Sequence, residues 1–543
     1  MTRVMTLLLV ASAALGQTAA PGNDTIREDE LRADLFFLAS DDMRGRLTET
    51  PENALAASFI RARFERLGLK PMGPNGSFYQ PFRLIRSALG ETNTLEFFVG
   101  DGPTYRALLR REFHPTAFSP TASSEGELAF VGYGLRAPKL GHDDYRGDVR
   151  GKIVLVLDHE PGERDADSRF DGVVTSEYSR DIRKVMYAQA AGAVGVLFVS
   201  DVHNHDEEGN FEESSQRAWP DPPSRVPRYT LAAWAEALRI PVAEVSPALV
   251  GTMLDVPLDE LARRADVPGG VEAERFPSVR IRLATGVERT IVSDRNVVAA
   301  IEGSDPQLKN EWVIICAHYD HDGADGARVF NGADDDGSGS VALLEIAEAY
   351  ATGARQGAAP RRSVLFAAWN SEERGLLGAW AYAEAPLAPL AQTVATLNMD
   401  MIGRNEEVPV GGGRRFRGLE LQTAESNRNA VHIMGYTYSG DLKRSVEEAN
   451  RFTELELEME YDNNESNLLR RSDQWPFLQK GVPSLFFHTG LHPDYHTEFD
   501  VPERIQYEKM TRIARLVHQL SWELAQADGR PRFDRPERAA AIP

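Results

Sequence analysis

The chain has 543 residues, of which 42% are hydrophobic and 26% are charged, a composition typical of soluble globular proteins. This length exceeds what one compact core holds, so we expect two or three domains. Acidic residues outnumber basic ones by 82 to 60, and the net charge of -22 disfavours nucleic acid as a partner.

The first twenty residues have the pattern of a secretory signal peptide. Arg3 supplies a positive start, residues 5–15 an apolar centre, and Gly16 and Ala20 a cleavage region of small residues. An uncleaved membrane anchor is the alternative, but its apolar run would have to be longer. No other stretch is long and apolar enough to span a membrane. We therefore expect an exported chain, periplasmic or extracellular, with no membrane span once residues 1–20 are removed.

Two amphipathic helices are expected next, over residues 25–43 and 51–67. In the first helix Leu31, Leu35 and Leu38 form one apolar stripe. Helices of this kind cover one face of a sheet.

The character of the sequence changes near Ser119. Short apolar runs over residues 127–134, 151–157 and 192–199 predict strands. This pattern resembles the protease-associated domain, a small β-rich insert, and we assign residues 119–270 to it.

Within this insert, residues 201–224 are acidic and end in prolines, which predicts a surface loop. His203 and His205 lie in it. A metal site is one interpretation of the two histidines, but we favour a solvated loop because the sequence shows no ordered scaffold around them.

The most informative stretch covers residues 312–339. An apolar run of strand length ends in His318, and a polar loop then leads to Asp335 and a helical pattern over residues 341–350. The run contains Cys316, the one cysteine, which we expect to be a buried thiol without a disulfide. In an open α/β sheet, sites form beyond the carboxyl ends of strands. One imidazole and one carboxylate make half of a typical zinc site.

Three later apolar runs, over residues 363–369, 394–399 and 484–487, also end near groups that bind metals. They lead to Glu372 and Glu373, to Asp400, and to His488 and His496. Two histidines and three carboxylates suit two zinc ions when one carboxylate bridges them, and a further glutamate is then free to act as a base.

Each of these residues also has an ordinary structural explanation. A glutamate pair usually lies on a solvated face, an aspartate run often forms a turn, Asp400 could cap a helix, and His496 could be a surface histidine. Their recurrence at four strand ends nevertheless favours one metal site.

These segments, in this order, resemble the co-catalytic dizinc aminopeptidases, a family that includes glutamate carboxypeptidase and the transferrin receptor. The matching motifs are His318-Tyr-Asp320, residues 332–339, Glu372-Glu373, residues 398–403, Arg471-Ser-Asp473 and Tyr495-His496. The resemblance implies an α/β fold of the zinc exopeptidase type, with a mixed central sheet flanked by helices. It also implies a peptide substrate.

The resemblance also assigns parts of the chain to domains. Residues 21–118 form the N-terminal part of the peptidase domain, and residues 285–527 form its dizinc catalytic part. Residues 528–543 are polar and proline-rich, so we expect a flexible tail.

By the same resemblance, Asp335 bridges two Zn²⁺ ions. His318 and Asp400 complete the ligands of one ion, and Glu373 and His496 complete those of the other.

The resemblance further implies that Glu372 is the general base and that Tyr495 binds the oxyanion. We expect Asp320 to hydrogen-bond His318 and to fix its tautomer.

The function implied first is that of an exported aminopeptidase. The alternatives are a dizinc carboxypeptidase or dipeptidase, a single-zinc enzyme like glutaminyl cyclase, and a receptor-like binding protein without metals. An aminopeptidase needs a carboxylate for the substrate ammonium, and a carboxypeptidase needs arginines for the substrate carboxylate. Both kinds of group are present: the carboxylates are Glu372, Asp400 and Asp473, and the arginines are Arg404, Arg470 and Arg471. The sequence leaves the oligomeric state open.

Overall fold

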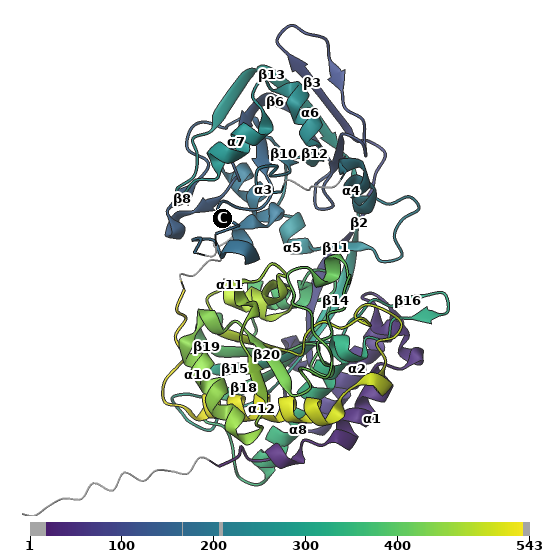
Figure 1. The fold of residues 1–543 in the computed structure, drawn as a ribbon, viewed down its shortest axis with the longest axis vertical. Coiled ribbons are helices and arrows are strands. Elements are labelled where there is room, and N and C mark those ends of the chain that lie inside the picture. Colours follow the sequence, from purple (N-terminus) through teal and green to yellow (C-terminus); the bar gives the residue numbers. More distant parts are fainter. Residues whose placement is uncertain (1–17, 166, 206–209, 536–543) are drawn as a thin grey trace, which may run out of the picture.

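The computed structural model describes residues 18–165, 167–205 and 210–535. These residues form two units, each built on its own large sheet (Figure 1). Most of the expected signal peptide, residues 1–17, lies outside the described residues. Within the described ranges, every helix is too short or too polar to cross a membrane.

The larger sheet runs in the order β11-β2-β14-β18-β15-β19-β22-β20-β21, with β1 beside β14. Its strands are β1 Lys70–Pro71, β2 Tyr79–Leu89, β11 Arg228–Leu231, β14 Val287–Ile301, β15 Trp312–His318, β18 Ser363–Trp369, β19 Thr393–Met399, β20 Ala430–Met434, β21 Glu456–Glu458 and β22 Ser484–His488. The central strands β18, β15, β19 and β22 are parallel to one another. β14 and β20 pair antiparallel to this group. The sheet is therefore mixed, as expected.

The central strands are continuous apolar runs because helices cover both faces of the sheet. Side chains of β15 alternate between two cores: Val313 and Ile315 belong to one, Ile314 and Cys316 to the other. The first core contains residues of α1 Glu28–Leu38, α2 Pro51–Arg66, α8 Gly339–Arg355, α10 Gly440–Ala449 and α12 Tyr507–Gln526. The second contains residues of α9 Leu377–Glu384 and α11 Gln474–Gln479. Cys316 is a buried free thiol, as expected.

The smaller unit has an eight-stranded sheet in the order β4-β3-β13-β6-β9-β10-β12-β5. Its strands are β3 Thr94–Val99, β4 Tyr105–Arg106, β5 Phe113–Pro115, β6 Ala122–Phe130, β9 Ile153–Leu157, β10 Gly195–Val199, β12 Val242–Val245 and β13 Glu274–Thr285. The helices α3 Asp181–Ala190, α6 Pro247–Met253 and α7 Leu258–Ala265 contribute to its core. The β-rich second unit expected from the sequence is thus present.

The extent of this unit differs from the expected insert, residues 119–270. β3, β4, β5 and β13 lie outside that range but belong to the smaller sheet, whereas β11 lies inside it and pairs with β2 of the larger one. The reason is the long antiparallel pair β2 and β14, which runs out of the larger unit. Beyond the end of this strand pair, the N–H of Gly90 donates a hydrogen bond to the carbonyl of Gly286, and both segments of the chain continue into the smaller sheet.

Two local expectations also need correction. The stretch 201–224, expected to be a loop, contains the helix α4 Phe211–Ala218. Residues 528–535 are not a free tail, because Arg532 lies 3.0 Å from Asp441 and Arg535 lies 3.0 Å from Asp171 of the smaller unit. Their polar composition suggested fraying, but the charged side chains have partners. Residues 536–543 lie outside the described part.

Candidate metal centre

The four parallel strands bring the predicted metal ligands to one edge of the larger sheet. Parallel neighbours end on the same side, so the residues that follow β15, β18 and β19 meet there. His318 ends β15, Glu372 and Glu373 follow β18, and Asp400 follows β19.

Asp335 and His496 reach the same place from loops. Asp335 lies in the turn Ala333–Ser338 that precedes α8, and His496 lies in the segment after β22.

Asp335 lies between two groups of possible ligands. Its Oδ1 is 3.3 Å from Nε2 of His318, and its Oδ2 is 2.9 Å from Nε2 of His496. Oδ1 of Asp400 is 3.6 Å from the His318 nitrogen, and Oε2 of Glu373 is 3.4 Å from the His496 nitrogen. Ligand atoms around a tetrahedral zinc ion, with bonds of about 2.0–2.1 Å, are separated by about 3.4 Å. The spacing thus suits two ions that share Asp335.

Three of the atoms that would bind metal are buried and lack hydrogen-bond partners. Among the described residues, no such partner is present for Nε2 of His318, Oδ1 of Asp400 or Nε2 of His496. Unpaired buried polar atoms are costly and call for an explanation. Cations at this edge would satisfy all three, so the residues fit a metal centre.

The electrostatics of Glu372 agree with this view. Burial raises the pKa of Glu372 well above its usual value; His318 opposes this shift, and Glu373 and Asp400 add to it. Crowded buried carboxylates cannot all be ionised without positive charge nearby.

The neighbours of Asp335 point elsewhere. Asp336 accepts hydrogen bonds from the backbone N–H of His318, at 3.1 Å, and from that of Gly339, at 2.8 Å. Asp334 accepts from the N–H of Gly403 at 2.6 Å. The two flanking carboxylates therefore tie strands and helix together, and Asp335 alone of the three faces both histidines.

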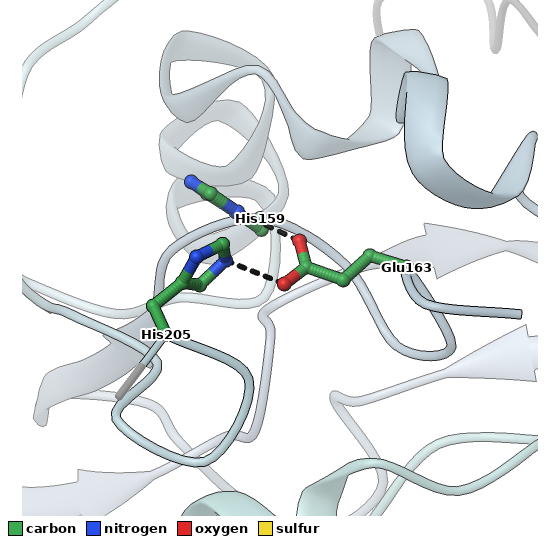
Figure 2. Close-up of side chains that lie close together, drawn as sticks. All are labelled: His159, Glu163 and His205. Carbon is green, nitrogen blue, oxygen red and sulfur yellow. Dashed lines mark hydrogen bonds and ion pairs between the residues drawn. The ribbon is translucent and has the colours of Figure 1, made fainter. Parts of the chain in front are cut away.

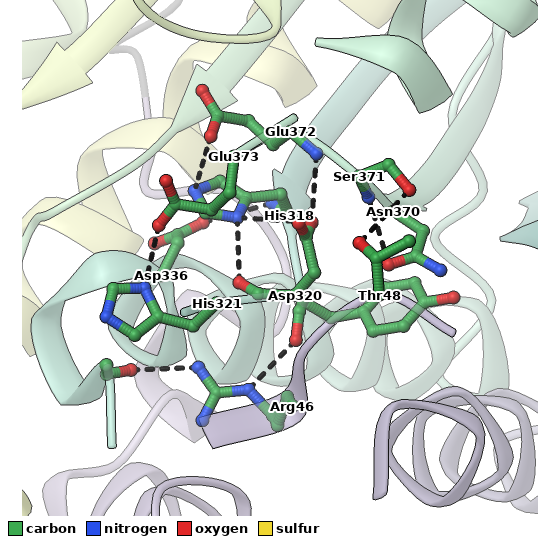
Figure 3. Close-up of polar contacts among 12 residues, drawn as sticks. Arg46, Thr48, His318, Asp320, His321, Asp336, Asn370, Ser371, Glu372 and Glu373 are labelled. Atoms are coloured by element: carbon green, nitrogen blue, oxygen red, sulfur yellow. Dashed lines mark hydrogen bonds and ion pairs between the residues drawn. The ribbon is translucent and has the colours of Figure 1, made fainter. Parts of the chain in front are cut away.

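Asp320 is adjacent to His318, but its role differs from the expectation. Nδ1 of His318 lies 3.2 Å from the backbone carbonyl of Asp320 and 3.7 Å from its carboxylate. The carboxylate instead accepts the N–H of Glu372 at 3.0 Å (Figure 3). The carbonyl thus orients the imidazole, and the side chain positions Glu372.

Three residues near the centre were not predicted as part of it. Nδ1 of His321 lies 2.8 Å from Oε1 of Glu373, and Asp322 lies 3.2 Å from Nδ1 of His496. Arg46 is fully buried and donates hydrogen bonds to the carbonyls of Tyr319, Leu38, Asn331 and Gly332. Proximity to the motif His318-Tyr-Asp320 was the only signal for the first two, and the sequence contains none for Arg46.

The centre opens into a cavity of about 280 Å³. It is lined by residues of the centre together with Tyr495 and two arginines: Asp335, Glu372, Glu373, Asp400, Tyr495, Arg470 and Arg471. The ring of Tyr495 packs against His496, with ring centroids 4.0 Å apart. Burial raises the pKa of Tyr495, so its hydroxyl keeps its proton and can donate a hydrogen bond into the cavity.

The smaller unit supports one wall of this cavity. Nη1 of Arg470 donates to the carbonyl of Val174 at 3.2 Å and also contacts the Thr175 hydroxyl. Nearby, the N–H of Glu177 donates to the side chain of Gln479 at 3.0 Å.

Comparison with known proteins places the chain among peptidases. Residues 296–521 match the family model described as peptidase family M28, and residues 119–228 match the PA domain. The chain is 25% identical over 434 residues to the probable glutamate carboxypeptidase AMP1 of Arabidopsis thaliana, a match covering 77% of this chain and 55% of that protein. It is also 25% identical to a probable zinc metalloprotease of Pyricularia oryzae, covering 59% of this chain and 73% of that protein.

Among solved structures, the aminopeptidase from Aneurinibacillus sp. strain AM-1 aligns with a TM-score of 0.49 at 19% identity, covering 94% of this chain and 97% of that one. A zinc aminopeptidase from Bacillus subtilis aligns with a TM-score of 0.43 at 18% identity, covering 94% and 98%. The family matches alone assign residues 296–521 to peptidase family M28 and residues 119–228 to the PA domain.

Proposed function

We propose that this protein is a dizinc exopeptidase in which Asp335 bridges the two ions. The observation that carries the proposal is the orientation of the Asp335 carboxylate, with one oxygen toward His318 and the other toward His496. His318 and Asp400 would hold one ion, and Glu373 and His496 the other. When bound, the pair would lower the pKa of water and polarise the peptide carbonyl.

The protein groups around the centre account for the remaining chemistry. Glu372 lines the cavity, and its N–H is held by Asp320. It would take a proton from the attacking water and deliver it to the leaving amine. The Tyr495 hydroxyl would donate a hydrogen bond to the oxyanion.

An aminopeptidase is the specificity we propose first. Glu372 and Asp400 face the cavity and offer carboxylates for a substrate ammonium, whereas Asp473 does not line it. Arg404 is paired with Asp494 at 2.9 Å and does not line the cavity either.

A carboxypeptidase is the second candidate, because Arg470 and Arg471 line the same cavity. Both guanidinium groups already donate to backbone carbonyls, those of Val174 and Ser466, which weakens this alternative.

A substrate panel decides between the two. The purified protein should hydrolyse aminoacyl-anilides with a free amino group and leave N-acyl dipeptides intact. Cleavage of acyl dipeptides alone would instead establish a carboxypeptidase. Zinc content compared between the wild type and a His318→Ala, Glu373→Ala double variant tests the remaining alternatives, since a dizinc centre would account for a difference of two ions, a glutaminyl cyclase-like centre for one and a receptor-like protein for none.

Export is part of the proposal and rests on residues 1–20 alone. Fractionation of cells expressing the full chain should place the protein outside the cytoplasm with residues 1–20 removed. Recovery of the intact chain in the cytoplasm would contradict it.

A further inference from the structure

We propose that the smaller unit carries a separate site for a divalent ion of the zinc class, formed by His159, Glu163 and His205. The two imidazoles lie next to each other, with ring centroids 4.3 Å apart, and each faces one oxygen of the Glu163 carboxylate (Figure 2). Nδ1 of His159 is 2.7 Å from Oε2 of Glu163, and Nε2 of His205 is 2.5 Å from Oε1. One ligand atom from each residue lies within 4.8 Å of the others.

The topology places these residues as it places those of the catalytic centre. β9 and β10 are parallel neighbours, with Leu157 beside Val199 at their ends. His159 and Glu163 follow β9, and His205 follows β10. The cluster thus lies at the carboxyl ends of adjacent parallel strands, where ligands bind in open α/β sheets.

The loops that carry the cluster are braced by two aspartates, Asp201 and Asp266. The carboxylate of Asp201 is fully buried and accepts the hydroxyl of Tyr133 at 2.5 Å. Asp266 accepts the N–H of Gly162 at 2.6 Å and the side-chain amide of Asn204 at 3.3 Å, so it joins the two loops. The expectation that no ordered scaffold supports this histidine loop is therefore wrong.

The donor set identifies the class of ion. Two imidazoles and one carboxylate can supply the three protein ligands of a tetrahedral zinc site whose fourth position holds water. Imidazole nitrogen selects zinc and its transition-metal neighbours over magnesium and calcium.

The site is also accessible from solvent. The Glu163 side chain is only 6% exposed, whereas the side chains of His159 and His205 are 42% and 33% exposed. His205 further lines a cavity of about 770 Å³. When zinc binds, the distances between the Glu163 oxygens and the histidine nitrogens would lengthen to about 3.4 Å, the separation of ligand atoms around a tetrahedral zinc ion. The bound ion would also cross-link the loops that follow β9 and β10.

Zinc content tests this proposal directly. The full chain, dialysed against buffered zinc, should hold one zinc ion more than each of His159→Ala, His205→Ala and Glu163→Gln. His203→Ala is the matched control, since His203 lies in the same loop with its nearest acidic partner, Asp259, 3.8 Å away. It should retain the wild-type content.

Equal zinc content in the wild type and all folded variants would overturn the proposal, and the cluster would then be a hydrogen-bonded triad. Glu163→Gln keeps the shape and hydrogen-bonding capacity of the side chain, so it decides the matter if the alanine variants do not fold. Peptidase turnover should stay within about twofold in all four variants, because none of them changes a group of the catalytic centre. Loss of a positioned catalytic group would lower turnover far more. A defective catalytic centre would instead lower zinc content and turnover in the wild type and every variant alike.

Discussion

Nε2 of His496 lies 2.9 Å from Oδ2 of Asp335, while the other oxygen of the same carboxylate faces His318. The two histidines come from chain segments about 180 residues apart, and one side chain lies between them. The backbone N–H of Asp335 donates to the carboxylate of Asp500 at 3.2 Å, which fixes the position of this bridge. This geometry supports the proposed centre for two ions.

Glu372→Gln should leave the metals bound and remove nearly all turnover. A neutral amide cannot accept the proton of water, and a positioned general base contributes about 10²–10⁴-fold. Zinc content and hydrolysis of an aminoacyl-anilide should be measured on one preparation. Glu373→Gln is the matched comparison, because it alters an expected metal ligand and should lower zinc content as well. Activity of Glu372→Gln within about tenfold of wild type would exclude Glu372 as the base.

Arg46→Lys should reduce both zinc content and thermal stability. Its guanidinium holds the carbonyls of Tyr319, Asn331 and Gly332, which flank the ligands of the centre. A lysine keeps the charge but cannot reach all three acceptors, and unsatisfied buried groups cost about 1–3 kcal/mol each. The control is Arg44→Lys, since Arg44 is exposed. Melting curves with and without added zinc should separate the two variants; indistinguishable curves would mean that Arg46 does not support the centre.

His518→Phe should make the protein less sensitive to acid. His518 is fully buried in α12 against Tyr350, and burial lowers its pKa to about 3. The unfolded chain binds a proton near pH 6.5 and the folded chain does not, so this group costs stability as the pH falls from 6.5 toward 3. Between pH 6.5 and 4.5 the loss is about 2 kcal/mol.

Urea unfolding of wild type and His518→Phe at several pH values measures that difference. The wild type should lose about 2 kcal/mol more than the variant over this range. His203→Gln, at a partly exposed histidine, should follow the wild type. Parallel pH dependence of wild type and His518→Phe would show that His518 is not protonated on unfolding.

The sequence predicts the parts of this protein that depend on local pattern. The strands β15 and β18 are continuous apolar runs with ligands at their ends, so both the strands and His318, Glu372 and Glu373 were recognisable. β19 and Asp400 follow the same rule.

Features that depend on distant segments could not be read in this way. Arg46 supports the centre from the N-terminal part of the chain, and nothing near it in sequence indicates four carbonyl partners. The extent of the smaller unit depends on the pairing of β2 with β14, which join its two ends. His205 looked solvated because its partners, His159 and Glu163, lie about 40 residues away along the chain and become neighbours only through β9 and β10.

The central claim is that Asp335 bridges two zinc ions, and zinc content measures it most directly. Asp335→Ala, His318→Ala and Glu373→Ala should be compared in a His205→Ala background, which excludes an ion at the smaller unit. The parent should hold two zinc ions, and the His318 and Glu373 variants should keep at least one. Asp335→Ala should hold fewer than one and melt at a lower temperature, because it loses a bond to each ion and the charge between them. Two zinc ions retained in Asp335→Ala, with both lost from either other variant, would contradict the bridge.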